Sequence, residues 1–220
     1  MAYTYLTLVN DVCRRLNEVE LTAANFATAV GQYGNIKDSV NYAIRDVNQD
    51  AYEWPFNHVT QDVTLAAGTT RYAFETDHKT TSMDTFRIQR NATFNNDTKH
   101  LRFITYEEYL ATYLDQEYNT SDTGIRRIPQ QVFRTPDLEF GVVPPPDEAY
   151  TLTYEYYQLP TDLDADTDVP SIPVQFRKTI NNGTMYYMYM FRSDTENTQL
   201  AQMKFEKDVK QMRKIGRAHV

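Results

Sequence analysis

Residues Ile128–Pro173 decide how this chain folds, and they read IPQQVFRTPDLEFGVVPPPDEAYTLTYEYYQLPTDLDADTDVPSIP. Two short stretches, Gln131–Arg134 and Leu138–Val143, lie on either side of a Pro-Asp turn signal. A proline block separates them from a longer, tyrosine-rich alternating stretch, Ala149–Gln158. Alternation of apolar and polar residues with a period of two is typical of strands that bury one face. The order of these stretches predicts a three-stranded β-meander.

The predicted meander leads into a helical C-terminal region. An acidic loop, Asp162–Asp168, comes first, and Pro173 suits the first turn of the helix after it. Gly183 would let this helix approach another closely. Its expected apolar stripe is Phe176, Ile180, Tyr187 and Phe191. A break at Ser193–Glu196 precedes a last helix, whose expected stripe is Leu200, Met203, Val209 and Met212, with Phe205 outside it.

Two more helices are predicted at the N-terminal end. The first spans Thr4–Asn17, and its residues at helical spacing are Leu6, Val9, Cys13 and Leu16. The second opens at Gly34 or Asn35 and ends before Trp54, because Pro55 keeps the residue before it out of the α region. We expect a long loop over residues 18–32, where the pattern is weak.

Further strands are predicted between the helical ends. Val59–Leu65 alternates, and Arg71–Phe74 is the expected return strand. Thr85–Arg90 is expected to pair with Leu101–Ile104. Thr105 and Glu108 then have the spacing of a capping box, which predicts a short helix from Tyr106 to about Tyr113. An exposed loop is expected over Asp115–Ile128.

The composition is that of a globular chain with an acidic balance. Apolar residues make up 41% and charged residues 24% of the 220, which permits a sizeable core. The net charge is −8, and an acidic chain binds DNA poorly because affinity for phosphate comes from Lys and Arg. No apolar run approaches the roughly 18 residues of a membrane span. The N-terminus lacks the features of a signal peptide.

Charge is unevenly distributed along the chain. Gln175–Lys214 contains eight basic and four acidic residues, a net charge of +4, so the rest is strongly acidic. This asymmetry is expected if the last helix meets an acidic partner. The final residues, Ile215–Val220 (IGRAHV), match a translated sequencing-library adapter, and we expect a non-native or flexible tail there. An ordinary polar tail is the alternative.

Patterns that carry metal or catalytic chemistry are weak. The aspartates of the acidic loop alternate as in a calcium site, but Thr167 and Pro173 stand where Gly and Glu are needed. Cys13 is the only cysteine and lies on an apolar stripe, which favours a buried structural thiol. No metal-binding spacing joins the histidines, which are His58, His78, His100 and His219.

Paired carboxylates are the remaining catalytic candidate. Glu139 and Glu155 lie on predicted strands and could approach one another. Nothing in the sequence fixes the separation of roughly 5–9 Å that glycosidases need. We therefore expect no catalytic residue, no metal and no cofactor.

The run Met185–Arg192 reads MYYMYMFR. Tyr, Met and Arg are enriched in protein interfaces, which favours a subunit boundary. The other interpretation is a helix that is apolar all round because it is buried in a bundle. In a ring both can hold, with one face packed inside and the other against a neighbour. The expected interface residues are Tyr186, Tyr187, Tyr189, Phe191 and Arg192.

These elements predict an α+β fold. An antiparallel helical bundle would form from both chain ends, with a β-rich antiparallel insertion between them. The expected domains are 1–55 (N-terminal helices), 56–158 (the β-rich insertion with one short helix), 159–214 (the acidic loop and C-terminal helix hairpin) and the tail 215–220.

The chain resembles a phage family, the head–tail adaptor proteins of short-tailed phages, also called portal-ring adaptor or tail tubular protein A. The segments that carry the resemblance are Pro144–Pro146, Asp147, Ala149–Tyr154, Pro160, Asp162–Asp168 and Ile172–Phe176. Tyr5–Glu18 and Val40–Phe56 resemble the first helices of the family. The central loops and the last helix match less well.

The resemblance implies a non-enzymatic virion protein at the head–tail junction, made in the host cytoplasm. Its copies would form a ring, expected to hold twelve, between the portal protein and the tail nozzle protein. Tail fibres are a further candidate partner. DNA would pass through the lumen without sequence-specific binding, and no membrane would be involved. The last helix would dock on the portal through Met203, Lys204, Lys207, Val209, Lys210 and Lys214.

Other interpretations stay open. The lysine-rich face of the last helix could simply be solvated. The β-rich insertion could bind a fibre or a carbohydrate, which would need an exposed aromatic platform, for example at Tyr154, Tyr156 or Tyr157. A cell-wall hydrolase would need two carboxylates in one cleft.

Overall fold

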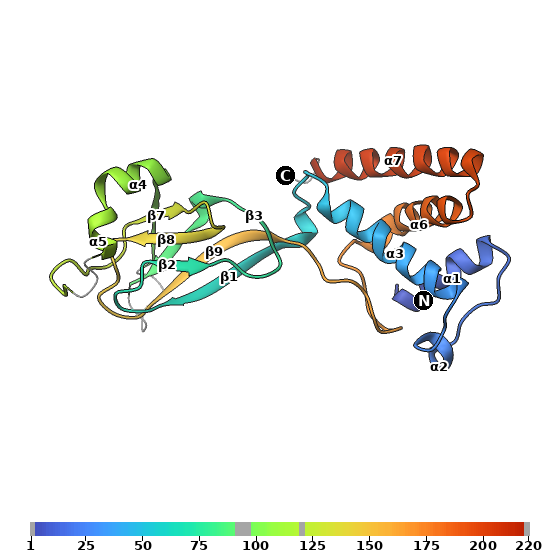
Figure 1. Ribbon diagram of the computed structural model, residues 1–220, viewed down its shortest axis with the longest axis horizontal. Coiled ribbons are helices and arrows are strands. Elements are labelled where there is room, and N and C mark those ends of the chain that lie inside the picture. The colour runs from blue at the N-terminus through green and yellow to red at the C-terminus, as the bar shows by residue number, and fades with distance from the viewer. Residues whose placement is uncertain (1–2, 91–97, 119–121, 218–220) are drawn as a thin grey trace. The chain divides into compact units, whose positions relative to one another are not determined.

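The computed structural model describes residues 3–90, 98–118 and 122–217. Over these residues the chain has seven α-helices and two sheets, so the predicted α+β class is confirmed. The chain divides into two compact units (Figure 1). The helical unit contains Met1–Asn57 and Leu159–Val220, and the β unit contains His58–Gln158.

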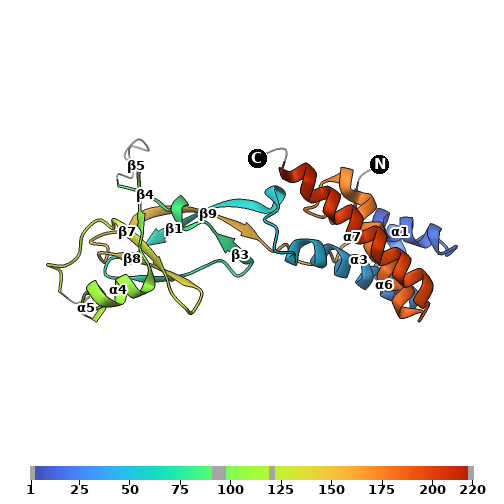
Figure 2. The ribbon, with the colours of Figure 1, turned by 90° about the horizontal axis from the view of Figure 1, so that it is seen from above.

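The helical unit combines segments from both ends of the chain. Its α-helices are α1 (Tyr5–Arg15), α2 (Ala23–Phe26), α3 (Gln32–Gln49), α6 (Arg177–Phe191) and α7 (Thr195–Arg217). Short 3-10 turns at Pro55–Asn57 and Val174–Phe176 follow α3 and precede α6. Helix α6 packs against α1, α3 and α7. Figure 2 shows α7 lying over α6.

One apolar core fills this unit and includes side chains from both chain ends. Val9, Val40 and Ile180 are fully buried. Trp54 is also buried, and its indole Nε1 donates a hydrogen bond of 2.6 Å to the carbonyl oxygen of Val47. Removing apolar surface from water is the dominant stabilising contribution to folding. Because the two chain ends share one core, each depends on the other for burial.

The N-terminal helices differ from the prediction at their boundaries. Helix α1 begins after Thr4, whose hydroxyl accepts the Thr7 N–H, and α3 begins at Gln32, before the predicted start. The expected loop over residues 18–32 contains α2. The last residue of α2, Phe26, is buried edge-on against Tyr5, with ring centroids 5.1 Å apart. One buried aromatic thus orders a segment that has little pattern of its own.

The buried face of α6 is not the predicted stripe. Ile180 is buried as expected, but Tyr187 is half-buried and Phe191 is exposed. The side chains that complete the buried face are Thr179, Asn181, Thr184, Met185 and Met188. Several of these are polar, and the Thr184 hydroxyl donates to the carbonyl oxygen of Ile180 at 2.9 Å. Internal hydrogen bonding of this kind allows polar side chains on the inner face.

The buried face of α7 also differs from the prediction. Phe205, expected outside the stripe, is buried, whereas Leu200 and Met203 are exposed. Met212 is buried as predicted, and Ala201 lies on the same inner face. Helix α7 continues to Arg217, into the expected tail 215–220, and residues 218–220 lie outside the described part of the chain.

Gly183 explains why Phe205 faces inward. A Cβ atom added at Gly183 would lie 2.8 Å from Ala43 Cβ and 2.8 Å from a ring carbon of Phe205. These separations are far below ordinary carbon–carbon contact distances. The absence of a side chain therefore lets both α3 and α7 approach α6 closely at this position, as the sequence predicted for Gly183.

The β unit contains two sheets. The larger has the order β1 (His58–Leu65), β9 (Tyr150–Gln158), β4 (Arg87–Gln89) and β5 (Thr98–His100), and β3 (His78–Thr81) also pairs with β9. The smaller has the order β2 (Arg71–Ala73), β8 (Glu139–Val143), β7 (Gln131–Arg134) and β6 (Arg102–Phe103). All pairs are antiparallel except β6 with β7. A 3-10 turn, Met83–Thr85, precedes β4.

The positions of the strands along the chain agree with the prediction, but the pairing between strands often does not. Strands β7 and β8 form the expected hairpin, but β9 joins the other sheet, so the predicted meander is wrong. The prolines at positions 144–146 lie between β8 and β9, and proline has no N–H to continue a ladder. The crossing brings Phe140 of β8 and Tyr154 of β9 into one core, with ring centroids 5.6 Å apart.

Of the two hairpins predicted earlier in the β unit, the first is wrong in its pairing, and the second forms with a shifted second strand. Strand β2 pairs with β8 instead of returning along β1. Strand β4 pairs with β5, and the Leu101 N–H continues this pairing with a hydrogen bond of 2.9 Å to the Phe86 carbonyl oxygen. The rest of the predicted partner, β6, pairs with β7. Leu65 and Leu101 are buried in the core that residues of both sheets share. Burial in this common core, which local alternation cannot specify, decides the partners.

Two short helices complete the β unit. Helix α4 (Tyr106–Thr112) begins as predicted, with the Thr105 hydroxyl accepting the Glu108 N–H at 3.2 Å. Helix α5 (Leu114–Tyr118) lies where an exposed loop was predicted. The Arg71 side chain forms an ion pair of 2.6 Å with Glu117 of α5, which ties this helix to β2.

Gly183→Ala tests the close packing of α6. We expect the added methyl group to destabilise the helical unit by about 1–3 kcal/mol through overpacking, although alanine favours helices. Gly34→Ala is the matched control, because nothing lies within 4 Å of a Cβ added there in α3. The control should stabilise by about 0.5–1 kcal/mol. Urea unfolding measures both, and equal stabilisation by the two variants would contradict the close contact.

Candidate partner-binding surface

The outward face of α7 is the most distinctive exposed surface of the helical unit. At 100° per residue, Met203, Lys207, Lys210 and Lys214 share one side of the helix. All are exposed, and 70% of the Met203 side chain is accessible to solvent. The buried residue Phe205 lies on the opposite side. We call the four outward residues the outer face.

The other two residues of the predicted docking set lie elsewhere. Val209 is partly buried and packs against the core of the helical unit. Lys204 lies on the flank of α7, where it lines a groove with Arg15 of α1. On the outer face itself, Lys210 forms an exposed ion pair of 3.8 Å with Glu206. Such pairs contribute little stability, so this lysine remains available for an acidic partner.

Polar contacts fix α7 to the rest of the unit. Arg213 forms an ion pair with Asp50 at the end of α3. Near the middle of α7, Asp208 accepts a hydrogen bond of 2.7 Å from the Asn182 side chain of α6. At the start of α7, Asp194 accepts hydrogen bonds from Asn197, which lower the pKa of the Asp194 carboxyl. The outer face is therefore held on a fixed scaffold.

The tyrosine-rich run of α6 has an inner and an outer side. Tyr186, Tyr187 and Tyr189 are half-buried, and Tyr189 packs against the core. Phe191 is exposed, and Arg192 forms an ion pair of 3.7 Å with Glu18. The helix is thus not buried all round.

Tyr187 is held by contacts within its own unit. Its hydroxyl donates a hydrogen bond of 2.5 Å to Asp46, and its ring lies 5.5 Å from that of Tyr42. Burial, followed by the Asp46 carboxylate, raises the pKa of Tyr187 above its ordinary value. This side chain therefore has a structural role in the single chain.

The acidic loop is ordered by backbone contacts. The Asn41 side chain binds both the N–H and the carbonyl oxygen of Leu163, at 3.1 and 2.9 Å. The Asp168 carboxylate accepts the N–H groups of Asp164 and Ala165, each at 2.8 Å. The Asp168 carbonyl oxygen accepts the first N–H of α1. The loop thus forms a rigid turn, and its last carboxylate is occupied by its own backbone.

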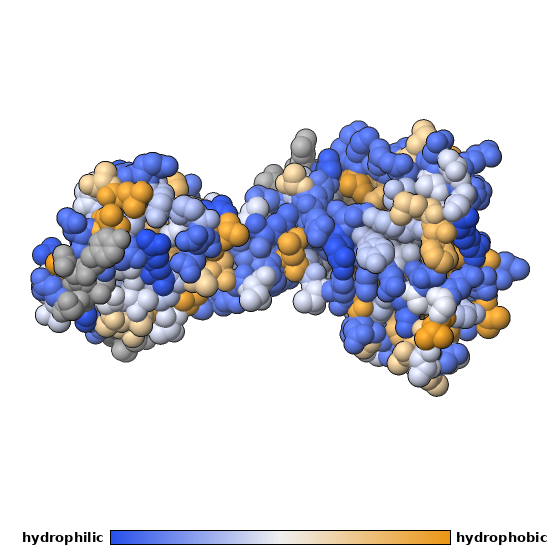
Figure 3. Space-filling model, viewed as in Figure 1, coloured by the Kyte–Doolittle hydropathy of each residue, from blue (hydrophilic) through white to orange (hydrophobic). Residues whose placement is uncertain are grey.

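The visible face of the helical unit is mostly hydrophilic, with apolar residues in small separate patches (Figure 3). The exposed apolar residues of α6 and α7 are Met190, Phe191, Leu200 and Met203. Interfaces commonly surround an apolar centre with a polar, solvent-accessible rim. The combination of exposed methionine and lysine on α7 has this composition.

Comparison of the sequence with models of known protein families identifies the family of this chain. The model described as SU10 adaptor protein matches residues 3–219. The chain belongs to this family. It is therefore a phage adaptor protein, and the resemblance to head–tail adaptors is confirmed. No curated protein sequence matches the chain.

The cysteine, the paired glutamates and the strand tyrosines of this adaptor were the remaining candidates for catalysis or ligand binding. Contacts within the fold account for their positions. Cys13 is buried, and burial raises the pKa of its thiol to about 11. Glu155 of β9 forms an ion pair of 2.7 Å with Arg87, while Glu139 lies on β8 of the other sheet. Tyr154 and Tyr156 are buried, so they form no exposed platform for a carbohydrate.

Each of the histidines that the structure describes has different neighbours. His58 lies 3.3 Å from Glu155, and His100 approaches the Asp84 carbonyl oxygen. His78 stacks on Phe74 with ring centroids 4.3 Å apart, and burial lowers its pKa. His219 lies outside the described residues. Within the described part, no three metal-ligating side chains come together, and no helix is long and apolar enough to cross a membrane.

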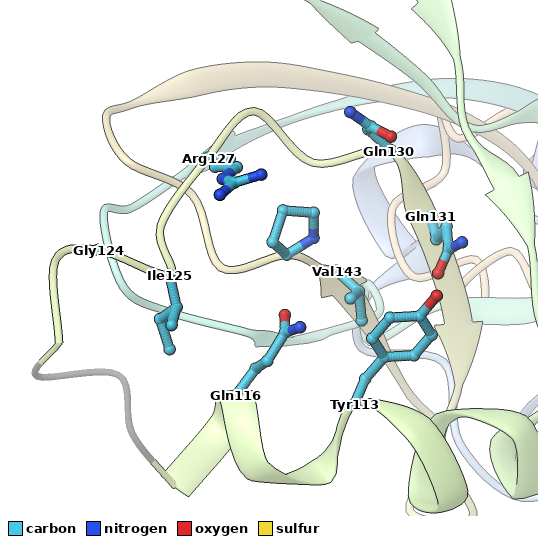
Figure 4. A pocket seen from close by; sticks show the side chains of 9 residues that line it. Tyr113, Gln116, Gly124, Ile125, Arg127, Gln130, Gln131 and Val143 are labelled. Atoms are coloured by element: carbon cyan, nitrogen blue, oxygen red, sulfur yellow. The ribbon is translucent and has the colours of Figure 1, made fainter.

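A cavity of about 320 Å³ lies in the β unit of the adaptor (Figure 4). Tyr113 and Gln116 border it on one side, and Gln131 and Val143 on the other. The side-chain oxygens of Gln116 and Gln131 are buried and have no hydrogen-bond partner among the described residues. Sequence reasoning missed this cavity because β7 and α5 meet through tertiary packing.

Replacing Tyr187 measures its role in the single chain. Tyr187→Phe removes only the hydrogen bond to Asp46 and should cost about 1 kcal/mol. Tyr187→Ala should cost about 2 kcal/mol, below the 3–5 kcal/mol typical of fully buried aromatics. The exposed Phe191→Ala is the control, with an expected change within about 0.5 kcal/mol. Chemical unfolding decides, and equal stability of wild type and both Tyr187 variants would contradict the contact with Asp46.

Proposed function

We propose that this adaptor forms a ring, of twelve copies, between the portal protein and the tail nozzle protein of a short-tailed phage. The family match over residues 3–219 carries this proposal. In such a ring the protein has a structural role and lines part of the channel through which DNA leaves the head. Tail fibres are a further candidate partner for the β unit.

Charge supports the placement of DNA and partners. The net charge of −8 suits a channel wall that does not hold a moving polyanion. The outer face of α7 instead presents Lys207, Lys210 and Lys214 around the exposed Met203. An acidic rim on the portal would be complementary to it. The apolar side chain would hold the complex, and the lysines would steer its formation.

Native mass spectrometry of the protein, alone and mixed with the portal protein of the same phage, tests the proposal. We expect a ring of twelve copies on the portal. A protein that stays monomeric with the portal over a wide concentration range would overturn the proposal.

Charge reversal tests docking through the outer face. Lys207→Glu with Lys210→Glu should slow association with the portal and flatten its dependence on salt, because rim charges mainly set the rate of encounter. Surface plasmon resonance at several salt concentrations measures both effects.

The matched control for docking is Lys99→Glu with Arg102→Glu. Both residues are exposed in the β unit, and the change in net charge is the same. If the control slows association as much as the α7 variant does, net charge matters and the outer face does not. Truncation after Asn197 is a poorer test, because it also removes the buried Phe205 and Met212.

A further inference from the structure

A groove between α1, α6 and α7 has the chemistry of a site for an acidic and apolar segment. Its volume is about 250 Å³. The side chains of Met185 and Ala201 are almost fully buried and form an apolar floor, and Leu200 is half exposed at the rim. Arg15 and Lys204 contribute positive charge, and the lining contains no carboxylate.

The two cations of this groove are available. Arg15 makes a long hydrogen bond of 3.3 Å to the Asn182 side chain, and Lys204 is exposed. Neither has an ion-pair partner within the described residues, whereas Arg14, next to Arg15, pairs with Asp11 and Glu20. Unpaired cations above an apolar floor favour a ligand that carries carboxylates beside an apolar side chain.

The acidic loop of the same chain carries such a segment. Asp164 is exposed and Asp166 half-exposed, and neither pairs with a basic residue in the described chain. Val169 follows them, with 62% of its side chain exposed. Negative charge is concentrated around the loop: burial first, and then Asp38 of α3 with the loop residues Asp162, Asp164 and Asp168, raise the pKa of Tyr5 above its ordinary value.

The conformation of the acidic loop is fixed before any partner binds. The contacts of Asn41 with Leu163 and of Asp168 with the loop backbone hold it in one conformation. A rigid segment loses little conformational entropy on association, so more of the interaction free energy appears as affinity.

The groove and the loop lie on different sides of the helical unit. The segment that leads into α6, orange in Figure 1, lies on the side away from α7. A ring is built from heterologous contacts, in which one surface of a copy meets a different surface of the next. With twelve copies each is rotated by about 30°, so the two surfaces must face nearly opposite directions.

We infer that the groove lined by Arg15 and Lys204 binds the Asp164–Val169 segment of a second copy of this chain. This contact rests on the proposed ring and specifies its subunit boundary. The two aspartates meet the two cations, and Val169 covers the apolar floor beside Leu200. The outer face of α7, with Lys207 and Lys210, is a different side of the helix and stays free for the portal.

Charge-reversed variants of the full-length protein test this contact. One variant carries Arg15→Glu with Lys204→Glu, and the other Asp164→Arg with Asp166→Arg. Each should need a protein concentration roughly tenfold higher or more to assemble, because like charges then face each other. Native mass spectrometry and sedimentation velocity, with and without the portal protein, measure assembly. Asp168 is left intact because its carboxylate holds the loop.

Mixing the two variants in equal amounts is the decisive measurement. In a ring where the two variants alternate, the acidic groove of one variant meets the basic loop of the other. At the next contact a wild-type groove meets a wild-type loop. Opposite charges therefore face each other at every contact, and assembly should return to the wild-type level. Lys99→Glu with Arg102→Glu, two exposed residues of the β unit outside both proposed surfaces, is the control and should assemble like wild type. Circular dichroism checks that each variant is folded.

The outcomes separate this inference from the proposed function. This contact is overturned if both reversed variants form rings as readily as the wild type, or if mixing them does not restore assembly. Neither result contradicts the ring itself. A wild-type protein that stays monomeric with the portal overturns both.

If a reversed variant fails to fold, cross-linking replaces it. Asp166→Cys with Lys204→Cys should give disulfide-linked ladders, since the natural Cys13 is buried and does not react. Absence of ladders from assembled rings would also overturn the contact.

Discussion

The close approach of three helices at Gly183 is the constraint on which the helical unit depends. Without a side chain at this position, α6 accepts both Ala43 of α3 and the Phe205 ring of α7. Phe205 then fixes the rotation of α7 about its own axis. That rotation decides which residues of α7 reach solvent, and it places Met203 and Lys207 outward. The proposed docking surface is thus a consequence of packing on the opposite side of the helix.

Local pattern predicted where the elements lie, and tertiary packing decided what they contact. The alternation in Tyr150–Gln158 identified a strand, and the hydroxyl of Thr105 begins α4 as its spacing indicated. The same pattern assigned β9 to a meander, although its inward tyrosines pack in a core that both sheets share. Sequence alternation says that a strand has a buried face and does not say what covers it.

The rotation of α6 and α7 could not be read from apolar residues for a related reason. Met203 and Phe191 are apolar and exposed, whereas Thr184 is polar and buried. A helix that packs on a core and also meets a partner has apolar residues on two sides. A search for one apolar stripe then combines residues from both sides and gives the wrong buried face. For the candidate site, the lysine spacing grouped Lys204 with Lys207 and Lys210, whereas in the structure Lys204 lines a groove formed with α1.

The pairing of β1 with β9 gives the β unit the character of an exchangeable module. The register places His58 opposite Tyr157, so the strands that enter and leave the unit are direct neighbours at its boundary. Opposed residues of antiparallel strands have Cα atoms only about 5 Å apart. A short turn could therefore span the two ends of the insertion without separating the helices that flank it. Evolution can enlarge, shrink or replace such a module while the core built from both chain ends is preserved.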